Sequence, residues 1–288
     1  MISIGLGISV KSEMSRIFLF LVVWVSFLAV GHGELVKVGV YTHSTNPVQA
    51  RSIVAVFTNI LTTGKGFDVR KVTPFEIREG VLTNLQVLIM PGGSGKKQAT
   101  NLETSGVDAI REFVRKGGGY VGFCAGSYLA SCQYPYSLHI INSRVVDREH
   151  WNRGTGTVNL KLTAKGRELL GHPEAEVEVF YGQGPLFAPT NEVGLPSYTE
   201  LATYGSEIVK NGASSGVMIN TTAISVAEFG EGRVVCFSPH PEKPFMPIHH
   251  LVVNAVRWTV GKDPIPMSQE AWAKRPMPTK PEILEPED

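Results

Sequence analysis

The sequence predicts an α/β protein with a mostly parallel central sheet and an antiparallel extension. From residue 35 to residue 123, short apolar runs alternate with helical patterns, which is the order of βαβ units in a parallel sheet. The run at 87–90 is apolar throughout, as expected for a strand covered on both faces. From 145 to 237 the runs are separated by Gly and Pro turns with few clear helices, which indicates antiparallel pairing.

The elements follow in order along the chain. The first half predicts strands at 35–41, 67–72, 87–90 and 120–123, and helical segments at 48–61, 76–81, 107–116 and 127–131. The second half predicts strands at 157–162, 175–181, 200–203, 223–229 and 233–237, and a final amphipathic helix at 248–260. The Pro-rich, charged tail at 262–288 is expected to pack poorly.

The first 33 residues have the order of a secretory signal peptide. Basic residues precede a charge-free apolar run at 17–30, which ends in the small residues Gly31 and Gly33. The run is shorter than the roughly 20 residues of a spanning helix. We therefore predict a signal peptide at 1–33, a secreted or lumenal mature chain beginning near Glu34, and no stable membrane span after cleavage. An uncleaved signal anchor is the alternative.

Composition narrows the possible partners. The chain carries 27 Lys and Arg against 26 Asp and Glu, spread along its length, so no basic face for nucleic acid is expected. Its three cysteines, Cys124, Cys132 and Cys236, do not form a disulfide framework. No His-x-x-x-His or Cys-x-x-Cys pair occurs, so we predict neither a metal nor another cofactor. The oligomeric state stays open.

A nucleophile elbow is predicted at Cys124. The segment GFCAG at 122–126 follows an apolar strand and precedes a helical segment. Glycine on both sides suits a strained turn in which larger side chains would collide with neighbouring backbone. The turn directs the thiol toward the N-terminus of the next helix, which favours negative charge there. Cys132 and Cys236 are expected to be inert buried thiols.

A base and its orienting group follow another apolar strand. The segment SPHPE supplies His240 and Glu242 directly after 233–237, at the carboxyl end where parallel sheets form ligand sites. A thiol nucleophile in acyl transfer needs a base, and the base needs an orienter. By contrast, His249 and His250 begin a helix and are expected to face solvent or cap it.

An oxyanion hole is predicted at the loop that follows the strand at 87–90. The segment MPGGSG ends this strand in glycines. The backbone amides of Gly92 and Gly93 are placed to bind a developing oxyanion together with the amide of Ala125. A phosphate-binding loop is not indicated, because the Walker spacing is absent.

In chain order, MPGGSG, GGGYVGFCAGSYLA and FSPHPE resemble the class I glutamine amidotransferase-like superfamily. They are most similar to the amidotransferase-like domain at the N-terminus of eukaryotic biotin-protein ligases. The segment YGQGP at 181–185 resembles that subgroup's Tyr-x-Gly-Gly-Pro, with Gln183 at a usual glycine.

The resemblance implies a flavodoxin-like three-layer sandwich for the domain at 34–261. It also implies a Cys-His-Glu triad formed by Cys124, His240 and Glu242. The expected oxyanion and substrate-binding residues are Gly92, Gly93, Ala125, Tyr128, Gly182, Gln183 and Gly184.

This sequence departs from the superfamily at two places. Glutaminases of the superfamily usually carry Gln four residues after the cysteine, where this chain has Tyr128, so glutamine is not the implied substrate. The Gly-Arg-Gly-Arg-type signature of biotin ligases is also missing, so biotin ligation is not implied. The leading hypothesis is a thiol hydrolase acting on an amide or γ-glutamyl-type bond of a small molecule. The alternatives are a catalytically inactive binding or regulatory module on the same fold and a redox sensor at Cys124.

Overall fold

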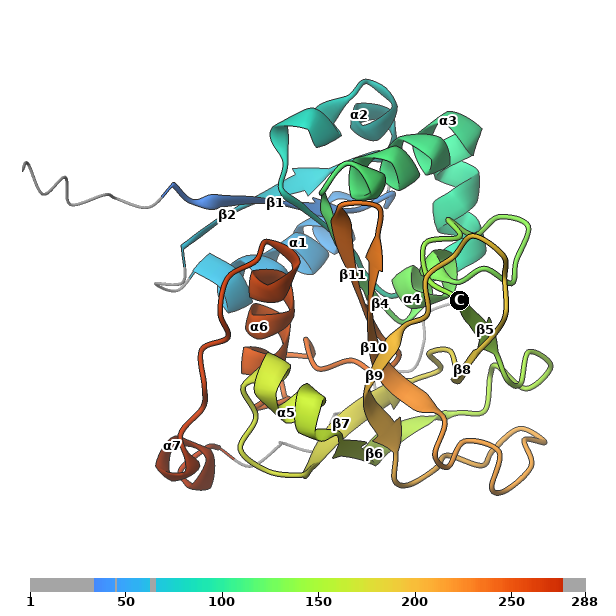
Figure 1. The fold of residues 1–288 in the computed structure, drawn as a ribbon, viewed down its shortest axis with the longest axis vertical. Helices are drawn as coiled ribbons and strands as arrows, with labels where there is room; N and C mark the ends of the chain where they lie inside the picture. The colour runs from blue at the N-terminus through green and yellow to red at the C-terminus, as the bar shows by residue number, and fades with distance from the viewer. Residues whose placement is uncertain (1–33, 45, 63–65, 277–288) are drawn as a thin grey trace, which may run out of the picture. The chain divides into compact units, whose positions relative to one another are not determined.

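The computed structural model describes residues 34–44, 46–62 and 66–276 (Figure 1). The predicted signal peptide at 1–33 and the last part of the tail, 277–288, lie outside the described residues.

One half of the sheet is parallel. In spatial order it contains β2 (Phe67–Val72), β1 (Val36–Tyr41), β3 (Val87–Met90), β4 (Gly119–Phe123) and β11 (Gly232–Phe237). Every neighbouring pair in this half runs in the same direction. The carboxyl ends of these strands therefore meet at one edge of the sheet, where the predicted elbow and the His-Pro-Glu segment both emerge.

The sheet continues beyond β11 with antiparallel strands. Their order is β10 (Thr222–Phe229), β9 (Thr199–Tyr204), β6 (Thr155–Leu162) and β7 (Glu176–Gly182). The predicted fold class, with its antiparallel extension, is confirmed. A short pair, β5 (Ser143–Val145) and β8 (Phe187–Pro189), attaches at β10 and was not predicted. Strands of three residues are too short to show an alternating pattern.

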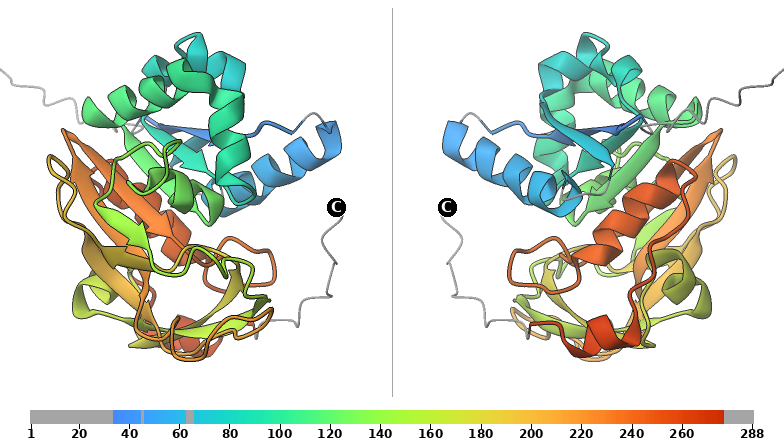
Figure 2. Two further views of the ribbon diagram at one scale, coloured as in Figure 1. Left: turned by 90° about the vertical axis from the view of Figure 1, so that its right-hand side faces the viewer. Right: turned by 90° about the vertical axis from the view of Figure 1, so that its left-hand side faces the viewer.

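Helices cover both faces of the parallel half (Figures 1 and 2). One layer contains α1 (Pro47–Thr62) and α6 (His249–Thr259), and the other contains α2 (Pro74–Arg78), α3 (Gly95–Arg115) and α4 (Ala125–Ala130). The 3-10 turn η1 (Val81–Asn84) follows α2, and α5 (Ala164–Leu170) follows β6. The short helix α7 (Gln269–Ala273) lies near the end of the described chain.

The two helical layers explain the continuous apolar run of β3. Val87 and Ile89 lie in the core cluster on the α1 and α6 side, whereas Leu88 and Met90 lie in the cluster on the α3 and α4 side. Successive side chains of a strand point to opposite faces, so a strand covered on both faces needs apolar residues at every position.

Two helices of the first half differ from the predicted ranges. Helix α3 begins well before residue 107, because Ser94 accepts a hydrogen bond from the Lys97 amide and caps it. Its first turns are mainly polar, and a break at Glu103, where φ is 58°, separates them from the amphipathic second half. Helix α2 also starts and ends earlier than predicted, with a capping box at its start.

Residues 262–276 are mostly exposed, as predicted for a poorly packed tail, but Trp272 is an exception to that prediction. Helix α7 places Trp272 against the ring of His172, with centroids 4.5 Å apart, and Trp272 is only 8% exposed. His250 stacks on His172, with 2.9 Å between His172 Nδ1 and His250 Nε2, so the expectation that it faces solvent or caps α6 was wrong. A single aromatic anchor within a polar, Pro-rich stretch gives no periodic signal.

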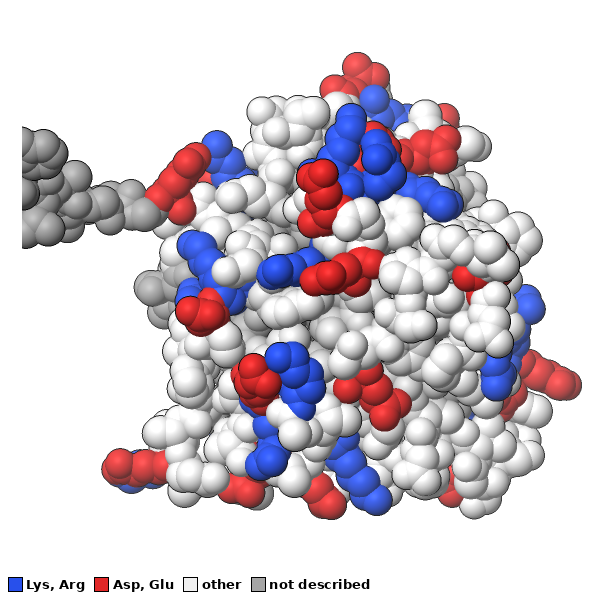
Figure 3. Space-filling model, viewed as in Figure 1, with Lys and Arg blue, Asp and Glu red and all other residues white. Residues whose placement is uncertain are grey.

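The charges in the described part of the chain are mixed. On the face shown in Figure 3, Lys and Arg side chains are interspersed with Asp and Glu. Among the helices of the described residues, none has both the length and the apolar character needed to cross a membrane.

We predict that acid weakens the attachment of α7. Burial is the largest cause that lowers the pKa of His172, to about 4. In the unfolded chain the His172 ring takes up its proton at the ordinary pKa of about 6.5. The folded state is therefore fully stable with respect to this group above about pH 6.5, and it loses free energy of unfolding as the pH falls toward 4. Tryptophan fluorescence should therefore shift to the red between pH 7 and pH 4, and a Trp272→Phe variant should lack the shift. A His172→Phe variant should respond less over this range, and equal responses would contradict the assignment.

Candidate active site

The elbow holds Cys124 in a strained conformation between β4 and α4. Its φ and ψ are 47° and −98°, and positive φ is unusual for a residue with a side chain. The Cys124 amide donates to the Phe237 carbonyl at 2.8 Å, and the Cys124 carbonyl accepts from the amides of Ser127 and Tyr128, both at 3.0 Å. The backbone bonds of β11 and α4 thus fix the direction of the thiol.

Close backbone contacts explain both flanking glycines. A Cβ on Gly126 would lie 2.2 Å from the Met90 carbonyl oxygen, and a Cβ on Gly122 would lie 2.7 Å from the Gly126 carbonyl carbon. Both separations are shorter than real Cβ contacts. The Ser127 hydroxyl oxygen also lies within hydrogen-bond distance of the carbonyl oxygens of Gly122 and Phe237, at 2.9 and 2.8 Å. The elbow therefore fits only because glycine lets α4 approach β3.

The structure brings His240 and Glu242 to the predicted cysteine. His240 Nδ1 and Glu242 Oε1 are 2.7 Å apart, and the two residues are 6% and 7% exposed. The Cys124 side chain is one of the groups that raise the pKa of His240. A Cβ on Gly92 would lie 2.8 Å from His240 Cε1 and 3.7 Å from Cys124 Cβ. The loop after β3 therefore lies against both side chains.

The His240 backbone is held by the far end of the sheet. Its amide donates to the Phe180 carbonyl of β7 at 2.8 Å. His240 follows β11, and β7 is the last strand of the sheet order, separated from β11 by β10, β9 and β6. Two residues further along β7, the Gly182 carbonyl accepts a hydrogen bond from Cys124 Sγ at 3.4 Å. The extension therefore curls back so that its last strand contacts the site.

The electrostatics of the site favour a cationic imidazole. Burial lowers the pKa of His240, but the charge of Glu242 and the contact with Cys124 outweigh burial and raise the pKa to about 10. His240 is then protonated near neutral pH. An imidazolium beside a sulfur atom stabilises negative charge on that sulfur.

Of the other predicted site residues, Gly93, Ala125, Tyr128 and Gln183 lie beside the thiol, whereas Gly184 has a packing role. Gly93, with φ of 133°, lies in the loop after β3, and Ala125 is the first residue of α4, where amides lack an acceptor within the helix. Tyr128 donates its hydroxyl to the Gln183 carbonyl at 3.2 Å. Gln183 has φ of 69°, which explains why glycine is favoured at this position. These residues border the thiol.

Gly184 has a packing role. It is buried, and a Cβ on it would lie 1.9 Å from the Ser238 carbonyl oxygen. Its place beside the segment that leads to His240 is therefore fixed by backbone contact.

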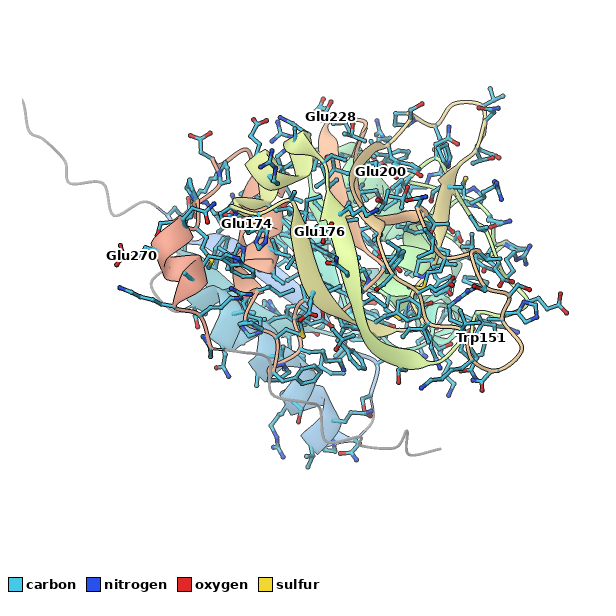
Figure 4. The ribbon with its side chains drawn as sticks, turned by 90° about the horizontal axis from the view of Figure 1, so that it is seen from below. Trp151, Glu174, Glu176, Glu200, Glu228 and Glu270 are labelled. Carbon is cyan, nitrogen blue, oxygen red and sulfur yellow. The ribbon has the colours of Figure 1, made fainter. Side chains whose placement is uncertain are left out.

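A cleft of about 700 Å³ opens at Cys124. Its lining includes residues for which the sequence predicted no role, namely Lys96, Tyr134, Tyr136, Arg148, Glu149 and Trp151. Their only signal was a cluster of aromatic and charged side chains in a stretch without periodicity. Trp151 lies across the molecule from Glu270 of α7 (Figure 4). A larger cavity of about 770 Å³, lined by Gln86 and Gly118, lies at the opposite edge of the parallel strands and has no cysteine or histidine in its lining.

Within the described ranges, no group of three or more His, Cys, Asp and Glu side chains is arranged to hold a metal ion.

We predict that Glu242→Gln lowers the pKa of His240. Removing the carboxylate removes the largest influence that raises this pKa, whereas burial remains and lowers it. The pKa should fall from about 10 to near or below the ordinary value of about 6.5. Titration of the histidine ring signals by NMR would measure the change. Glu149→Gln, which removes a carboxylate from the cleft, should leave the pKa in place. An unchanged value in Glu242→Gln would refute this role of Glu242.

The fold and the site together define a flavodoxin-like α/β sandwich with a cysteine elbow at the carboxyl edge of its parallel strands. Residues 36–151 match the family described as biotin-protein ligase, N terminal, which confirms the resemblance seen in the motifs. The matched segment includes the loop after β3 and the elbow, and it ends before His240 and Glu242.

Solved structures share this fold at low sequence identity. A ThuA-like protein from Parabacteroides merdae superposes with a TM-score of 0.55 at 14% identity, covering 86% of this chain and 96% of its own. A second ThuA-like protein, from Bacteroides uniformis, gives a TM-score of 0.53 at 15% identity, covering 81% of this chain and 94% of its own. A search of curated proteins found no match.

Proposed function

We propose that this protein is a thiol hydrolase that cleaves an amide or γ-glutamyl-type bond of a small molecule. The observation that supports this most directly is that Cys124, at the wall of a cleft, and His240 both lie against Gly92, while Glu242 binds His240 at 2.7 Å. A nucleophile, a base and an orienter in this order are the components of acyl transfer.

The first half of the proposed reaction forms a thioester. The sulfur of Cys124 attacks the substrate carbonyl carbon, and the oxygen that becomes negative is bound by the amides of Gly93 and Ala125. His240, already protonated, gives its proton to the leaving nitrogen as the carbon–nitrogen bond breaks. Glu242 holds the imidazole in place through Nδ1.

The second half regenerates the enzyme. Water attacks the thioester carbon while His240 takes one of its protons, and the carbon–sulfur bond then breaks. The products are a carboxylic acid and an amine or ammonia, and the sulfur and imidazole return to their starting states.

The alternative function is a binding or regulatory module without turnover. The observation that favours it is Tyr128, whose hydroxyl is bonded to the Gln183 carbonyl at the place where superfamily glutaminases usually carry Gln. Its ring occupies the cleft wall beside Cys124.

We predict that Cys124→Ala abolishes turnover. A panel of glutamine, γ-glutamyl and small amide substrates would identify one that the wild-type protein hydrolyses. On that substrate the variant should lose at least about 1,000-fold in kcat, as is typical when a nucleophile is removed. Cys132→Ser provides the matched control and should retain activity. Unchanged turnover by Cys124→Ala would rule out the proposed mechanism.

Thiol labelling tests the same site without a substrate. Burial raises the pKa of the Cys132 thiol, and it raises that of Cys236 to about 12. Iodoacetamide at neutral pH should therefore label Cys124 first. Equally slow labelling of all three cysteines would favour the binding module.

We also propose that the chain enters the secretory route, on the evidence of the apolar run at 17–30. Expressed with its own N-terminus in eukaryotic cells, the protein should appear in the medium or the lumen and begin at His32 or Glu34. N-terminal sequencing would measure this. A Leu21→Arg variant, which interrupts the apolar run, should stay in the cytosol. Recovery of wild-type protein with its N-terminus intact would contradict cleavage.

A further inference from the structure

The cleft has an aromatic wall that the proposed chemistry does not use. The rings of Tyr134 and Tyr136 are stacked, with centroids 5.1 Å apart and an angle of 16° between their planes. The ring of Tyr128 meets Tyr134 edge-on at 6.1 Å. We call these three residues the aromatic shelf. Trp151 adds a fourth ring at the cleft, and it is 53% exposed. A cleft lined by several aromatic rings favours a ligand with a ring of its own.

A cation lies on the aromatic shelf. The Arg148 guanidinium carbon is 4.6 Å from the centroid of the Tyr134 ring. A planar guanidinium presents its N–H donors as a fork that matches both oxygens of a carboxylate. The neighbouring acid, Asp147, is bound to His150 at 3.0 Å and to Arg153 at 2.7 Å. Among the ion pairs of the described residues, none involves Arg148.

The charge of the cleft is positive on balance. Lys96, from the start of α3, and Arg148 both line it, and Glu149 is the acid among its lining residues. An anionic ligand is therefore favoured over a neutral one of the same shape. The cations lie in the same cleft as Cys124, so such a ligand would be held within reach of the thiol.

We propose that the cleft binds a substrate that carries an aromatic ring with a carboxylate close to it. The aromatic shelf would hold the ring, and Arg148 would hold the carboxylate. Tyr134, Tyr136 and Arg148 are then specificity residues of the site. This proposal rests on the proposed function for its reacting bond, but the binding step needs no turnover.

A pair of probes isolates the charge. Phenylacetate and phenylacetamide share a ring and differ in charge, and their affinities can be measured by titration calorimetry on protein carrying Cys124→Ala, so that no reaction occurs. Phenylacetate should bind at least about tenfold more tightly, as expected for one charge-assisted contact. Arg148→Gln should remove this preference by weakening phenylacetate alone. Tyr136→Leu should weaken both probes several-fold.

The matched control is Arg111→Gln. Arg111 also lies over an aromatic ring, 5.6 Å from the centroid of Phe229, and it does not line the cleft. This variant should keep the preference for phenylacetate. The proposal is overturned by equal affinities for the two probes, by no binding of either, or by a preference that survives in Arg148→Gln.

The two proposals can fail separately. If phenylacetate binds as described but no amide is turned over by the wild-type protein, the ligand class stands and the hydrolase is rejected. If an amide is hydrolysed through Cys124 but the probes do not discriminate, the hydrolase stands and the ligand class is rejected.

Discussion

The site depends on the close approach of α4 to β3. The backbone at Gly126 lies so near the Met90 carbonyl that a single added carbon would come within 2.2 Å of the oxygen. This contact lets the chain turn at Cys124 with a positive φ and start a helix at once. The same strand end continues into the loop of Gly92 and Gly93, which therefore reaches the thiol. One tight backbone contact thus fixes both the nucleophile and the donors proposed for the oxyanion.

A second constraint is the burial of charge. His240 and Glu242 are almost fully buried, and within the described part of the chain Glu242 Oε2 has no hydrogen-bond partner. Isolated charges in such a place are strongly unfavourable. The imidazole and the carboxylate stabilise each other, and the bond from the His240 amide to the Phe180 carbonyl holds the His240 backbone against β7. A fixed arrangement of this kind is what general acid–base chemistry requires.

The sequence was most informative where spacing reflects sterics. The elbow glycines and the continuous apolar run at 87–90 could be interpreted because backbone contact and two-sided burial restrict those positions to few residue types. The cleft wall could not be predicted, because Tyr134, Arg148 and Trp151 lie in a stretch without regular period, and only tertiary structure brings them to Cys124. Trp272 was missed for the same reason. The first turns of α3 were not predicted to be helical, because their residues are mainly polar and the helix breaks at Glu103.

The curled extension has a consequence for how the site can vary. The parallel half provides the thiol and the loop after β3, whereas β7, the last strand in the sheet order, provides the Gly182 carbonyl that contacts the thiol and the Phe180 carbonyl that holds His240. The distance between sulfur and imidazole therefore depends on the curvature of four antiparallel strands. Changes far from the cleft, such as a bulge in β9 or β10 or a different packing of β6, would alter the reactivity of Cys124 without replacing any residue that touches it.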